Sequence, residues 1–440
     1  MERRSEKMNI TTFMLPAGYH KDSWRLEGSR AEELGFLDFV AELTLLAEEA
    51  KLDAVFFGDI VTADTILRND VKMNGLYEPI TVLSALAART SRIGLIGTVS
   101  TTFSEPYNLA RQIMGIDHMS GGRAGWNIVT SSRGNQNFGL EEMPDPEDRY
   151  RRAQEYLRVV TQLWDSWDEG AVVTDRARGV WAETERLHRI DHHGEFFDVQ
   201  GPLNMRRSLQ GRPIIVQAGS SGPGIDLGSS YADCIYTAQP DKQRAQEYYA
   251  DYKRVVAGKG RNPAQVKILP GLVPILGDTE REAHELADHL ASLVNLEFGI
   301  SQLEASHRMD LSGIDVDDRI PVDRFPERFP TSRSAIFKRR ALEDGLTLRE
   351  LIIEDARGTG HGFFIGTAAQ AAEYMIDWFD DRACDGFNVN APFMPGGMEA
   401  MCRGLIPELQ ERGYFREDYA GSTLREHLGL DAPARALKRG

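Results

Sequence analysis

The sequence predicts an α/β protein with a (β/α)8 TIM barrel that carries long insertions. Short β-rich runs alternate with helical patterns along most of the chain, and eight such runs can be counted. An open, doubly wound sheet could use the same elements, but no GxGxxG follows the first run and no GxxxxGKS/T occurs anywhere. We therefore expect one barrel domain over residues 1–440.

Four predicted strands lie in the first part of the chain, with helical patterns between the later ones. They are rich in β-branched and aromatic residues and cover 8–13, 52–59, 93–100 and 123–130. The segment FLDFVAELTLLAEEA places Leu37, Val40, Leu43 and Ala47 on one stripe, as an amphipathic helix requires. The segments ITVLSALAART and PYNLARQIMGIDHM follow the same pattern.

The other four predicted strands cover 212–219, 233–239, 266–277 and 385–392. Two connections in this half are too long for simple crossovers. The insertion 168–211 lies between the fourth and fifth strands, and its segment VWAETERLHRIDHHGEFFDVQGPLN suggests a small hairpin. The insertion 278–345 follows the seventh strand and shows little periodicity after about residue 295. Loops at the C-terminal strand ends surround the reactive face of a barrel, so we expect this insertion to act as a lid.

Bulk composition favours small-molecule chemistry. The chain has 440 residues, 41% hydrophobic and 27% charged, with a formal net charge of −16 that disfavours nucleic acid or an anionic membrane as partner. The start lacks the apolar core of a signal peptide, and no run approaches the roughly 20 residues of a membrane helix. The three cysteines form no CxxC pair, so we expect core cysteines in a cytoplasmic protein.

Hydroxyl and amide residues dominate the predicted strand ends. The hydroxyl residues are Thr98, Ser100, Thr101, Thr102, Thr130 and Ser131, and one carboxylate, Asp59, ends the second strand. A glycosidase needs two facing carboxylates, and Asp59 is the one obvious carboxylate at these ends. No HxH stands at a strand end and no HExxH occurs, and we interpret His192 and His193 as structural, so we expect no metal site.

The segment AGSSGPG, Ala218 to Gly224, is the best candidate for an anion site. Its glycines let the backbone approach a ligand, Ser220 and Ser221 offer hydroxyls, and the residues that follow can begin a helix with unsatisfied amides. A phosphate fits such a site. A tight strand-to-helix turn without a ligand accounts for the glycines equally well.

Several separated motifs together carry a family resemblance. They are SGGRAGWNIVTS, STTFSEPYNLARQ, QAGSSGPG and DGFNVNAPFMPGGMEAMCRGLIPELQERGYFREDY. With them the chain resembles the flavin-dependent monooxygenases of the nitrilotriacetate monooxygenase component A group, within the bacterial luciferase-like barrels. Dibenzothiophene sulfone and long-chain alkane monooxygenases belong to the same group. The resemblance implies that the protein binds reduced FMN from a separate flavin reductase and inserts one oxygen atom of dioxygen into a substrate.

The resemblance also implies the site residues. The flavin contacts fall on Asp59, Thr101, Thr102, Ser131, Tyr150 and Ser221, with Ser220 beside them. Tyr150 and Ser221 are expected to hold the phosphate, in agreement with the anion site inferred from the glycines. Asn127 and Thr130 are weaker candidates, because a strand residue can face the barrel core instead.

Three residues are candidates for a catalytic role. Some relatives carry histidine where this chain has Ser132 and Pro146, which leaves open the group that assists at the flavin. His20, in AGYHKDSWR, is either an active-site polar group or a histidine that caps a loop. His361 lies between glycines in a segment expected to be mobile.

The leading functional hypothesis is a two-component monooxygenase that oxidises C–N, C–S or C–H bonds of a small organic substrate. A deazaflavin-dependent dehydrogenase on the same barrel and a non-catalytic flavin-binding protein are the alternatives. Arg133, Arg25 and Arg357 give a slight preference for an anionic substrate, although solvated surface arginines explain them as well. By analogy with related barrels, we expect a homodimer or homotetramer.

Overall fold

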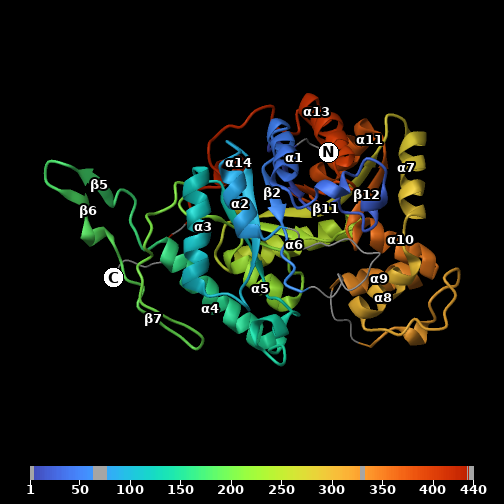
Figure 1. The fold of residues 1–440 in the computed structure, drawn as a ribbon, viewed down its shortest axis with the longest axis horizontal. Helices are drawn as coiled ribbons and strands as arrows, with labels where there is room; N and C mark the ends of the chain where they lie inside the picture. The colour runs from blue at the N-terminus through green and yellow to red at the C-terminus, as the bar shows by residue number, and fades with distance from the viewer. Residues whose placement is uncertain (1–3, 63–76, 328–331, 434, 436–440) are drawn as a thin grey trace.

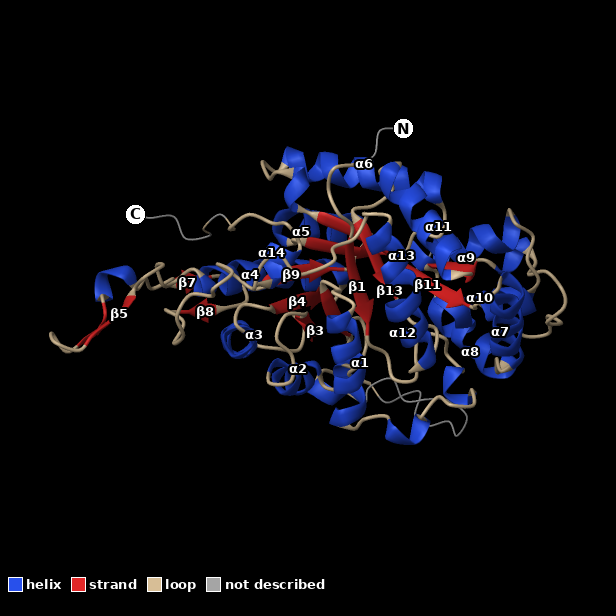
Figure 2. Cartoon of the chain, turned by 90° about the horizontal axis from the view of Figure 1, so that it is seen from above, coloured by secondary structure: helices blue, strands red, loops and turns tan. Residues whose placement is uncertain are grey.

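A ring of parallel strands surrounded by helices forms the centre of the protein (Figures 1 and 2). The computed structural model describes residues 4–62, 77–327, 332–433 and 435. The main sheet has the strand order β10-β9-β4-β3-β2-β1-β13-β11-β12, and the additional pairing of β10 with β11 closes it. The eight strands of the ring confirm the predicted TIM barrel. They are β1 (Asn9–Phe13), β2 (Ala54–Phe57), β3 (Gly94–Ser100), β4 (Ala124–Val129), β9 (Ile214–Gln217), β10 (Cys234–Thr237), β11 (Lys267–Leu276) and β13 (Gly386–Val389).

Strand β12 (Gly362–Gly366) was not predicted from the sequence and lies outside the ring. It pairs in parallel with Leu272–Leu276, the far half of β11. The near half of β11 pairs with β10 and closes the barrel. His361 therefore directly precedes a paired strand.

Helices cover the outside of the ring. They are α1 (Leu37–Glu49), α2 (Pro79–Ala87), α3 (Pro106–Ser120), α4 (Pro146–Trp164), α5 (Gly222–Tyr231), α6 (Lys242–Gly258), α11 (Ala368–Asp380), α12 (Gly396–Ala400) and α13 (Ile406–Glu411), whereas the short α14 (Leu424–His427) packs against the interior of the ring. Five of them carry proline in the first turn, Pro79, Pro106, Pro146, Pro223 and Pro407. Proline suits this turn because its amide is not needed there and its φ is already helical. The first four of these prolines set where the helices begin after the barrel loops.

The strands bury both of their faces. Val55 and Phe57 point out toward the helices, while Phe56 between them points into the ring. The inward set contains Phe56, Ile96, Val216, Tyr236 and Leu269, together with Leu424 and Leu428 from the C-terminal segment. The helix α14 thus adds apolar side chains to the interior of the barrel.

An aspartate stands directly before three of the strands, at the N-terminal end of the ring. Asp53 precedes β2, Asp233 precedes β10 and Asp385 precedes β13. Each accepts a hydrogen bond from an amide of the neighbouring strand, Ile10, Ile215 and Ile268 respectively. Each also pairs with a cation, Arg416, Arg425 and Lys253 in the same order. This end of the barrel is therefore tied together by buried ion pairs.

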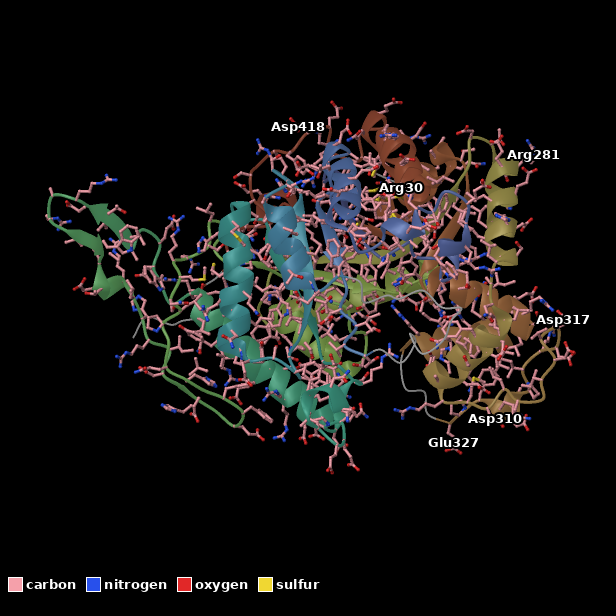
Figure 3. The ribbon with its side chains drawn as sticks, in the orientation of Figure 1. Arg30, Arg281, Asp310, Asp317, Glu327 and Asp418 are labelled. Carbon is pink, nitrogen blue, oxygen red and sulfur yellow. The ribbon has the colours of Figure 1, made fainter. Side chains whose placement is uncertain are left out.

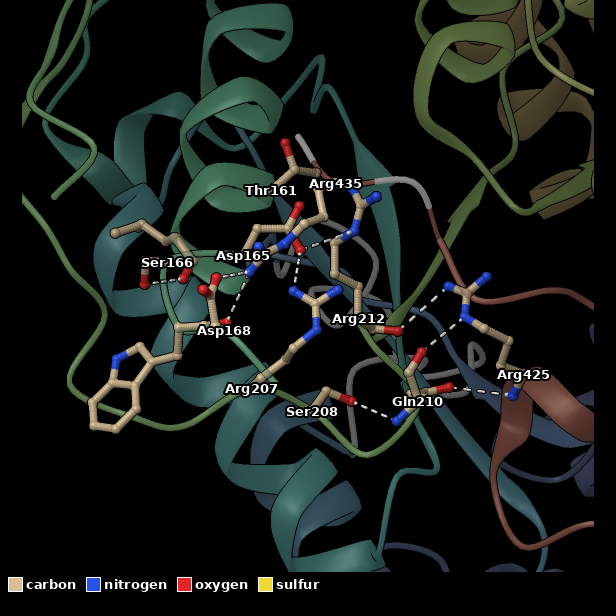
Figure 4. Close-up of polar contacts among 12 residues, drawn as sticks. Thr161, Asp165, Ser166, Asp168, Arg207, Ser208, Gln210, Arg212, Arg425 and Arg435 are labelled. Atoms are coloured by element: carbon tan, nitrogen blue, oxygen red, sulfur yellow. Dashed lines mark hydrogen bonds and ion pairs between the residues drawn. The ribbon is translucent and has the colours of Figure 1, made fainter. Parts of the chain in front are cut away.

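Further charged contacts join the C-terminal segment to the residues before β9 (Figure 4). Asp165 pairs with Arg207 at 2.8 Å and with Arg212 at 3.6 Å. Arg425 donates through Nε to the Gln210 carbonyl at 3.1 Å, and Arg435 pairs with Asp168. Arg425 and Arg435 are thereby joined to the residues before β9.

Two hairpins lie in the insertion 168–211. Strands β5 (Val172–Asp175) and β6 (Val180–Ala182) form the first, which projects from the body of the molecule beyond α3 (Figure 1). Strands β7 (His192–His193) and β8 (Asp198–Val199) form the second, within the segment where a hairpin was suggested. His192 bonds Glu155 at 3.0 Å and His193 bonds Asp198 at 2.8 Å. Both histidines thus have a partner within the protein.

The insertion 278–345 is more regular than its sequence suggested, although its residues 328–331 lie outside the described part. It contains α7 (Glu280–Ser292), α8 (Leu296–His307) and α9 (Ser332–Leu342), followed by α10 (Leu348–Gly358). Leu303, Phe337 and Leu351 belong to a small core of its own. Acidic residues such as Asp310 and Asp317 point away from this core at the edge of the molecule (Figure 3). Among the described residues, no helix is long and apolar enough to cross a membrane.

Candidate active site

The predicted site residues gather at the C-terminal end of the barrel. Asp59 follows β2, Thr101 and Thr102 follow β3, Ser131 follows β4 and Ser221 follows β9. These strands are neighbours in the ring in the order β2, β3, β4 and β9. Side chains separated in the sequence therefore line one arc of the barrel mouth, where barrel enzymes place their reactive groups.

Hydroxyl groups of β3 and β4 form a connected cluster on this arc. Ser131 Oγ donates to Ser100 Oγ at 2.8 Å, and the Thr102 amide donates to the same Ser100 oxygen at 3.1 Å. One layer below, Asn127 Nδ2 donates to Thr98 Oγ1 at 2.9 Å. The side chain of Asn127, a weaker candidate in the sequence, thus faces Thr98 across the two strands.

Two buried oxygens of this cluster have no hydrogen-bond partner among the described residues. They are Thr102 Oγ1 and Asn127 Oδ1. Leaving a buried polar group unpaired costs about 1–3 kcal/mol, so native proteins seldom keep such groups without a ligand or water. These two atoms indicate that the arc is built to receive a polar molecule.

The predicted anion site is assembled from α4 and α5. Tyr150 Oη and Ser221 Oγ lie 3.2 Å apart, although 71 residues separate them in the sequence. Ser221 caps α5 and accepts a hydrogen bond from the Gly224 amide at 3.2 Å. A cavity of about 580 Å³ opens between the two helices, lined by Tyr150, Gly222, Pro223 and their neighbours. Tyr150 and the first residues of α5 thus border this cavity, together with the carboxyl side chains of Glu147 and Asp226. The Ser221 hydroxyl lies beside Tyr150 at the helix N-terminus, where an anion is favoured.

Asp59 lies at the edge of this arc with a perturbed carboxyl group. Partial burial raises its pKa, and the negative charge of Glu78 raises it further. The side chain therefore holds a proton more readily than an ordinary aspartate.

The opposite side of the mouth contains His361. Leu269 faces the barrel interior, so Gly271, two residues further along β11, faces the same side. A Cβ on Gly271 would lie 2.2 Å from His361 Nδ1, so the imidazole fills the space that this glycine leaves. Burial and the nearby charge of Arg333 lower the pKa of His361 to about 3. The ring is therefore neutral at physiological pH.

Aromatic rings continue from His361 into the barrel. Tyr19 meets His361 edge-on at 5.6 Å between centroids, and Phe13 lies 6.1 Å from Tyr19. Phe13 stacks on Phe56 at 4.6 Å, and Phe56 lies 5.0 Å from Tyr236. We call these five residues the aromatic wall. The wall was not predicted from the sequence, although the alternation along β2 indicates that Phe56 faces the interior while its two neighbours face outward.

His20 lies buried beside the aromatic wall, but its contacts favour a positioning role. Its Nδ1 accepts a hydrogen bond from the Asp22 amide at 3.3 Å. Its own amide donates to the Pro392 carbonyl at 2.9 Å, and that of Tyr19 donates to Ala391 at 2.8 Å. His20 thus caps its loop and helps to hold Tyr19 against the segment that follows β13.

Part of the loop after β4 makes hydrogen bonds within the loop itself. Asn135 is buried, and its Nδ2 donates to the carbonyls of Leu140 and Glu141 at 2.9 and 3.0 Å. The amide nitrogen of Asn135 is therefore used within the loop. Ser132 and Arg133 are exposed at the start of the loop. The catalytic role of Ser132 and the preference of Arg133 for an anionic substrate stay predictions.

Fold and site together define a barrel enzyme with a polar arc and an aromatic wall at one mouth. Residues 17–380 match the family model described as Luciferase-like monooxygenase. The chain is 40% identical over 437 residues to N-acetyl-S-(2-succino)cysteine monooxygenase of Bacillus subtilis, covering 98% of this chain and 99% of the relative. It is 37% identical over 450 residues to nitrilotriacetate monooxygenase component A of Aminobacter aminovorans, covering 99% of each.

A solved structure agrees with these relatives. EDTA monooxygenase from Chelativorans sp. BNC1 superimposes with a TM-score of 0.79 at 32% identity, covering 97% of this chain and 99% of that one. The chain therefore belongs to the luciferase-like monooxygenase family and is a monooxygenase. The resemblance stated from the sequence motifs is confirmed.

Proposed function

We propose that the protein is the oxygenase of a two-component system that uses reduced FMN and dioxygen to oxidise a small organic acid. The observation that carries this proposal is the meeting of Tyr150 with Ser221 at the N-terminus of α5. A phosphate group supplies the negative charge that such a site stabilises. The family relationship favours flavin mononucleotide as the compound whose phosphate binds there.

The residues of the arc fit the rest of the cofactor. Thr102 Oγ1 and Asn127 Oδ1 offer hydrogen-bonding capacity that the described protein leaves unused. Ser131, Thr101 and Asp59 stand beside them with hydroxyl and carboxyl groups. Reduced FMN supplies the electrons that activate dioxygen, so the chain itself needs no nucleophile. Its residues hold the flavin, position the substrate and keep water away.

The lid expected over the mouth is proposed to be the α8–α9 part of the insertion 278–345. It has a small core of its own, so it can act as a unit against the barrel. His361 stands next to the mouth as a neutral imidazole and is the best-placed of the three catalytic candidates. Ser132 remains a candidate on the flavin side, and His20 supports Tyr19 from behind.

The substrate is proposed to be a carboxylated molecule oxidised at carbon, at nitrogen-linked carbon or at sulfur. The names of the two relatives above designate such molecules. A flavin reductase is the proposed partner, in accordance with the component A designation of one relative. The deazaflavin dehydrogenase and the non-catalytic flavin-binding protein lose support because whole-length relatives are monooxygenases.

The test is an anaerobic titration of the purified protein with chemically reduced FMN. We expect Tyr150→Phe and Ser221→Ala each to weaken binding about tenfold, the effect of losing one hydrogen bond to a charged group. Ser230→Ala is the matched control, because Ser230 lies in the last turn of the same helix and its Oγ donates to the Asp226 carbonyl at 2.8 Å. Unchanged binding in both site variants removes the phosphate site.

A second measurement tests the reaction itself. Nitrilotriacetate and N-acetyl-S-(2-succino)cysteine are supplied with reduced FMN and isotopically labelled dioxygen, and the product is analysed by mass spectrometry. One labelled oxygen atom in the product supports a monooxygenase with that substrate class. Oxidation of both acids in the absence of dioxygen contradicts the proposal.

A further inference from the structure

The insertion after β11 presents one arginine to the barrel mouth. Arg333 lies in the first turn of α9, next to Ser334. Ser334 Oγ and His307 Nδ1 lie 2.9 Å apart, and the His307 ring stacks on Phe337 at 4.2 Å. These contacts anchor the first turns of α9 to α8. Arg333 is therefore held at a defined place while its own side chain is exposed.

The guanidinium of Arg333 reaches His361. Its Nη2 lies 3.4 Å from His361 Nε2, and its Cγ would lie 3.5 Å from a Cβ on Gly360, whose φ is +84°. Arginine can only donate, so Nε2 is the acceptor and the proton of the neutral imidazole is on Nδ1. The contact fixes the direction of the guanidinium without neutralising its charge.

Four other arginines near this end of the barrel donate to backbone carbonyls, whereas Arg133 is exposed in the loop after β4. Arg149 donates to the Ser131 carbonyl at 2.6 Å, Arg152 to Thr101 at 3.3 Å and Arg357 to Ala287 at 3.4 Å. Arg25, one of the arginines suggested from the sequence, donates to the Leu293 carbonyl. Among the residues that the structure describes, no carboxylate forms an ion pair with Arg333. Its charge is thus open to an anion from solution.

The surroundings define the kind of anion. Tyr19 lies edge-on to His361, and Phe13, Phe56 and Tyr236 continue the aromatic wall into the barrel. Tyr19, Phe56 and Tyr236 are buried, so a molecule bound by Arg333 can meet the wall only at the partly exposed rings of His361 and Phe13. The whole chain carries a net charge of −16, so a small anion is repelled at long range and needs an unneutralised cation at its destination.

We propose that Arg333, oriented by His361, binds a carboxylate of the substrate at the lid side of the barrel mouth. The inference rests on the proposed function and makes Arg333 a specificity-determining residue for small organic acids. The planar guanidinium offers two parallel donors, which match the two oxygens of a carboxylate. The carbon chain of the substrate lies along the partly exposed rings of the aromatic wall and points the remainder toward the arc formed by β3 and β4.

The experiment is a calorimetric titration of the protein with succinate, glutarate and tricarballylate, with butane-1,4-diol as the neutral probe. We expect saturable binding of at least one acid and none of the diol. Arg333→Gln weakens acid binding about tenfold to a hundredfold, as expected for losing hydrogen bonds to a charged group. Arg333→Lys retains part of the affinity, because the charge remains while the planar pair of donors is lost.

The matched control is Arg339→Gln, which removes the same charge from the same helix. Equal binding by Arg333→Gln and Arg339→Gln overturns the proposal, and so does the absence of saturable binding by all three acids. If the two variants unfold at the same temperature, a folding defect in α9 is excluded as the cause of weaker acid binding. A titration with reduced FMN separates the two hypotheses: Arg333-dependent acid binding without FMN binding keeps the carboxylate site and refutes the proposed function.

Discussion

The two ends of the barrel are built from opposite chemistry. At the N-terminal end, Asp53, Asp233 and Asp385 each pair with a cation and accept a hydrogen bond from a neighbouring strand. At the C-terminal end the groups are hydroxyls, amides and aromatic rings, and Thr102 and Asn127 keep oxygens without a described partner. At the N-terminal end the carboxylates are paired within the chain, although Arg416 Nη1 is buried without a described partner, whereas at the C-terminal end the unpartnered atoms are a hydroxyl and an amide oxygen.

This difference separates stability from function within one ring of strands. Removing a partner from a buried ion pair leaves a charge without compensation, so damage at the N-terminal end acts on folding. Damage at the C-terminal end acts on groups that the folded protein does not need for itself. The following variants test whether the two ends can be perturbed independently.

The largest effect is expected for Asp385→Asn. Its carboxylate accepts from Lys253 at 2.7 Å, from Tyr249 at 2.9 Å and from the Ile268 amide at 3.0 Å. The variant leaves Lys253 buried without its counter-charge, and we expect a loss of about 3–5 kcal/mol in the free energy of unfolding. Chemical denaturation measures the loss, and the affinity of the folded fraction for reduced FMN is expected to stay the same.

Asp418→Asn is the control for that variant. Its side chain is 82% exposed and lies 3.5 Å from Lys51, so the change is expected to cost less than about 1 kcal/mol. If Asp385→Asn is no more destabilising than Asp418→Asn, the ion pairs do not stabilise this end of the barrel. If it is destabilising but also abolishes FMN binding by the folded protein, the two ends are not independent.

From the carboxylate of Asp385 we also expect the free energy of unfolding to depend on pH, with a smaller effect than that of the substitution. Burial works to raise the pKa of Asp385, but the charge of Lys253 and its hydrogen bond outweigh this, and the pKa is lowered. A lowered pKa stabilises the folded state above the unfolded value of about 3.9, and this contribution is lost as the pH falls through the folded pKa. Between about pH 5 and pH 2, the wild type should therefore lose more stability than Asp385→Asn. Parallel acid unfolding curves for the two proteins contradict this.

At the other end, Gly271→Ala tests the lid side of the mouth. The new Cβ would meet His361 Nδ1 at 2.2 Å, so the imidazole must move away from the barrel axis. Overpacking of this kind costs about 1–3 kcal/mol, which the side chain can relieve by rotating outward. We expect acid binding at Arg333 to weaken about tenfold while the Kd for reduced FMN is unchanged.

Gly362→Ala provides the comparison for this substitution. A Cβ there meets its nearest atoms at 3.7 Å, so it fits without movement of His361. Acid binding by Gly362→Ala should therefore equal that of the wild type. If Gly271→Ala binds the acids as well as Gly362→Ala does, the position of His361 does not matter for the substrate.

The ring of strands was predictable because its signals are local. Runs such as IGLIGTVS and RAGWNIVT are β-rich in themselves, and their spacing leaves room for one helix between neighbours. Strand β12 was missed because it has only five residues with glycine at both ends, and it exists because β11 extends beyond the ring. The helices α8 and α9 were missed because prolines and acidic residues interrupt the apolar spacing around them.

The candidate site likewise has one part that the sequence predicts and one part that it does not. The arc was predictable because hydroxyls at the ends of neighbouring parallel strands must meet, and Tyr150 with Ser221 came from the family motifs. The contact of Arg333 with His361, and of His361 with Tyr19, joins the first turn of α9, the residue before β12 and the loop after β1. No local pattern marks such a meeting. The three aspartates before strands were visible in LDAV, ADCI and CDGF, but only their partners reveal what they do.

The smallest effect, and the sharpest contrast, is expected for Thr102→Val. The substitution preserves shape and removes a buried hydroxyl that has no described partner, so the ligand-free protein should be as stable as the wild type or about 1 kcal/mol more stable. Reduced FMN should bind several-fold more weakly. Thr44→Val is the control, because Thr44 Oγ1 donates to the Val40 carbonyl at 2.7 Å, and its removal should destabilise by about 1 kcal/mol. If both variants lose the same stability, the Thr102 hydroxyl already serves the fold, and the contrast between the two ends of the barrel fails at this residue.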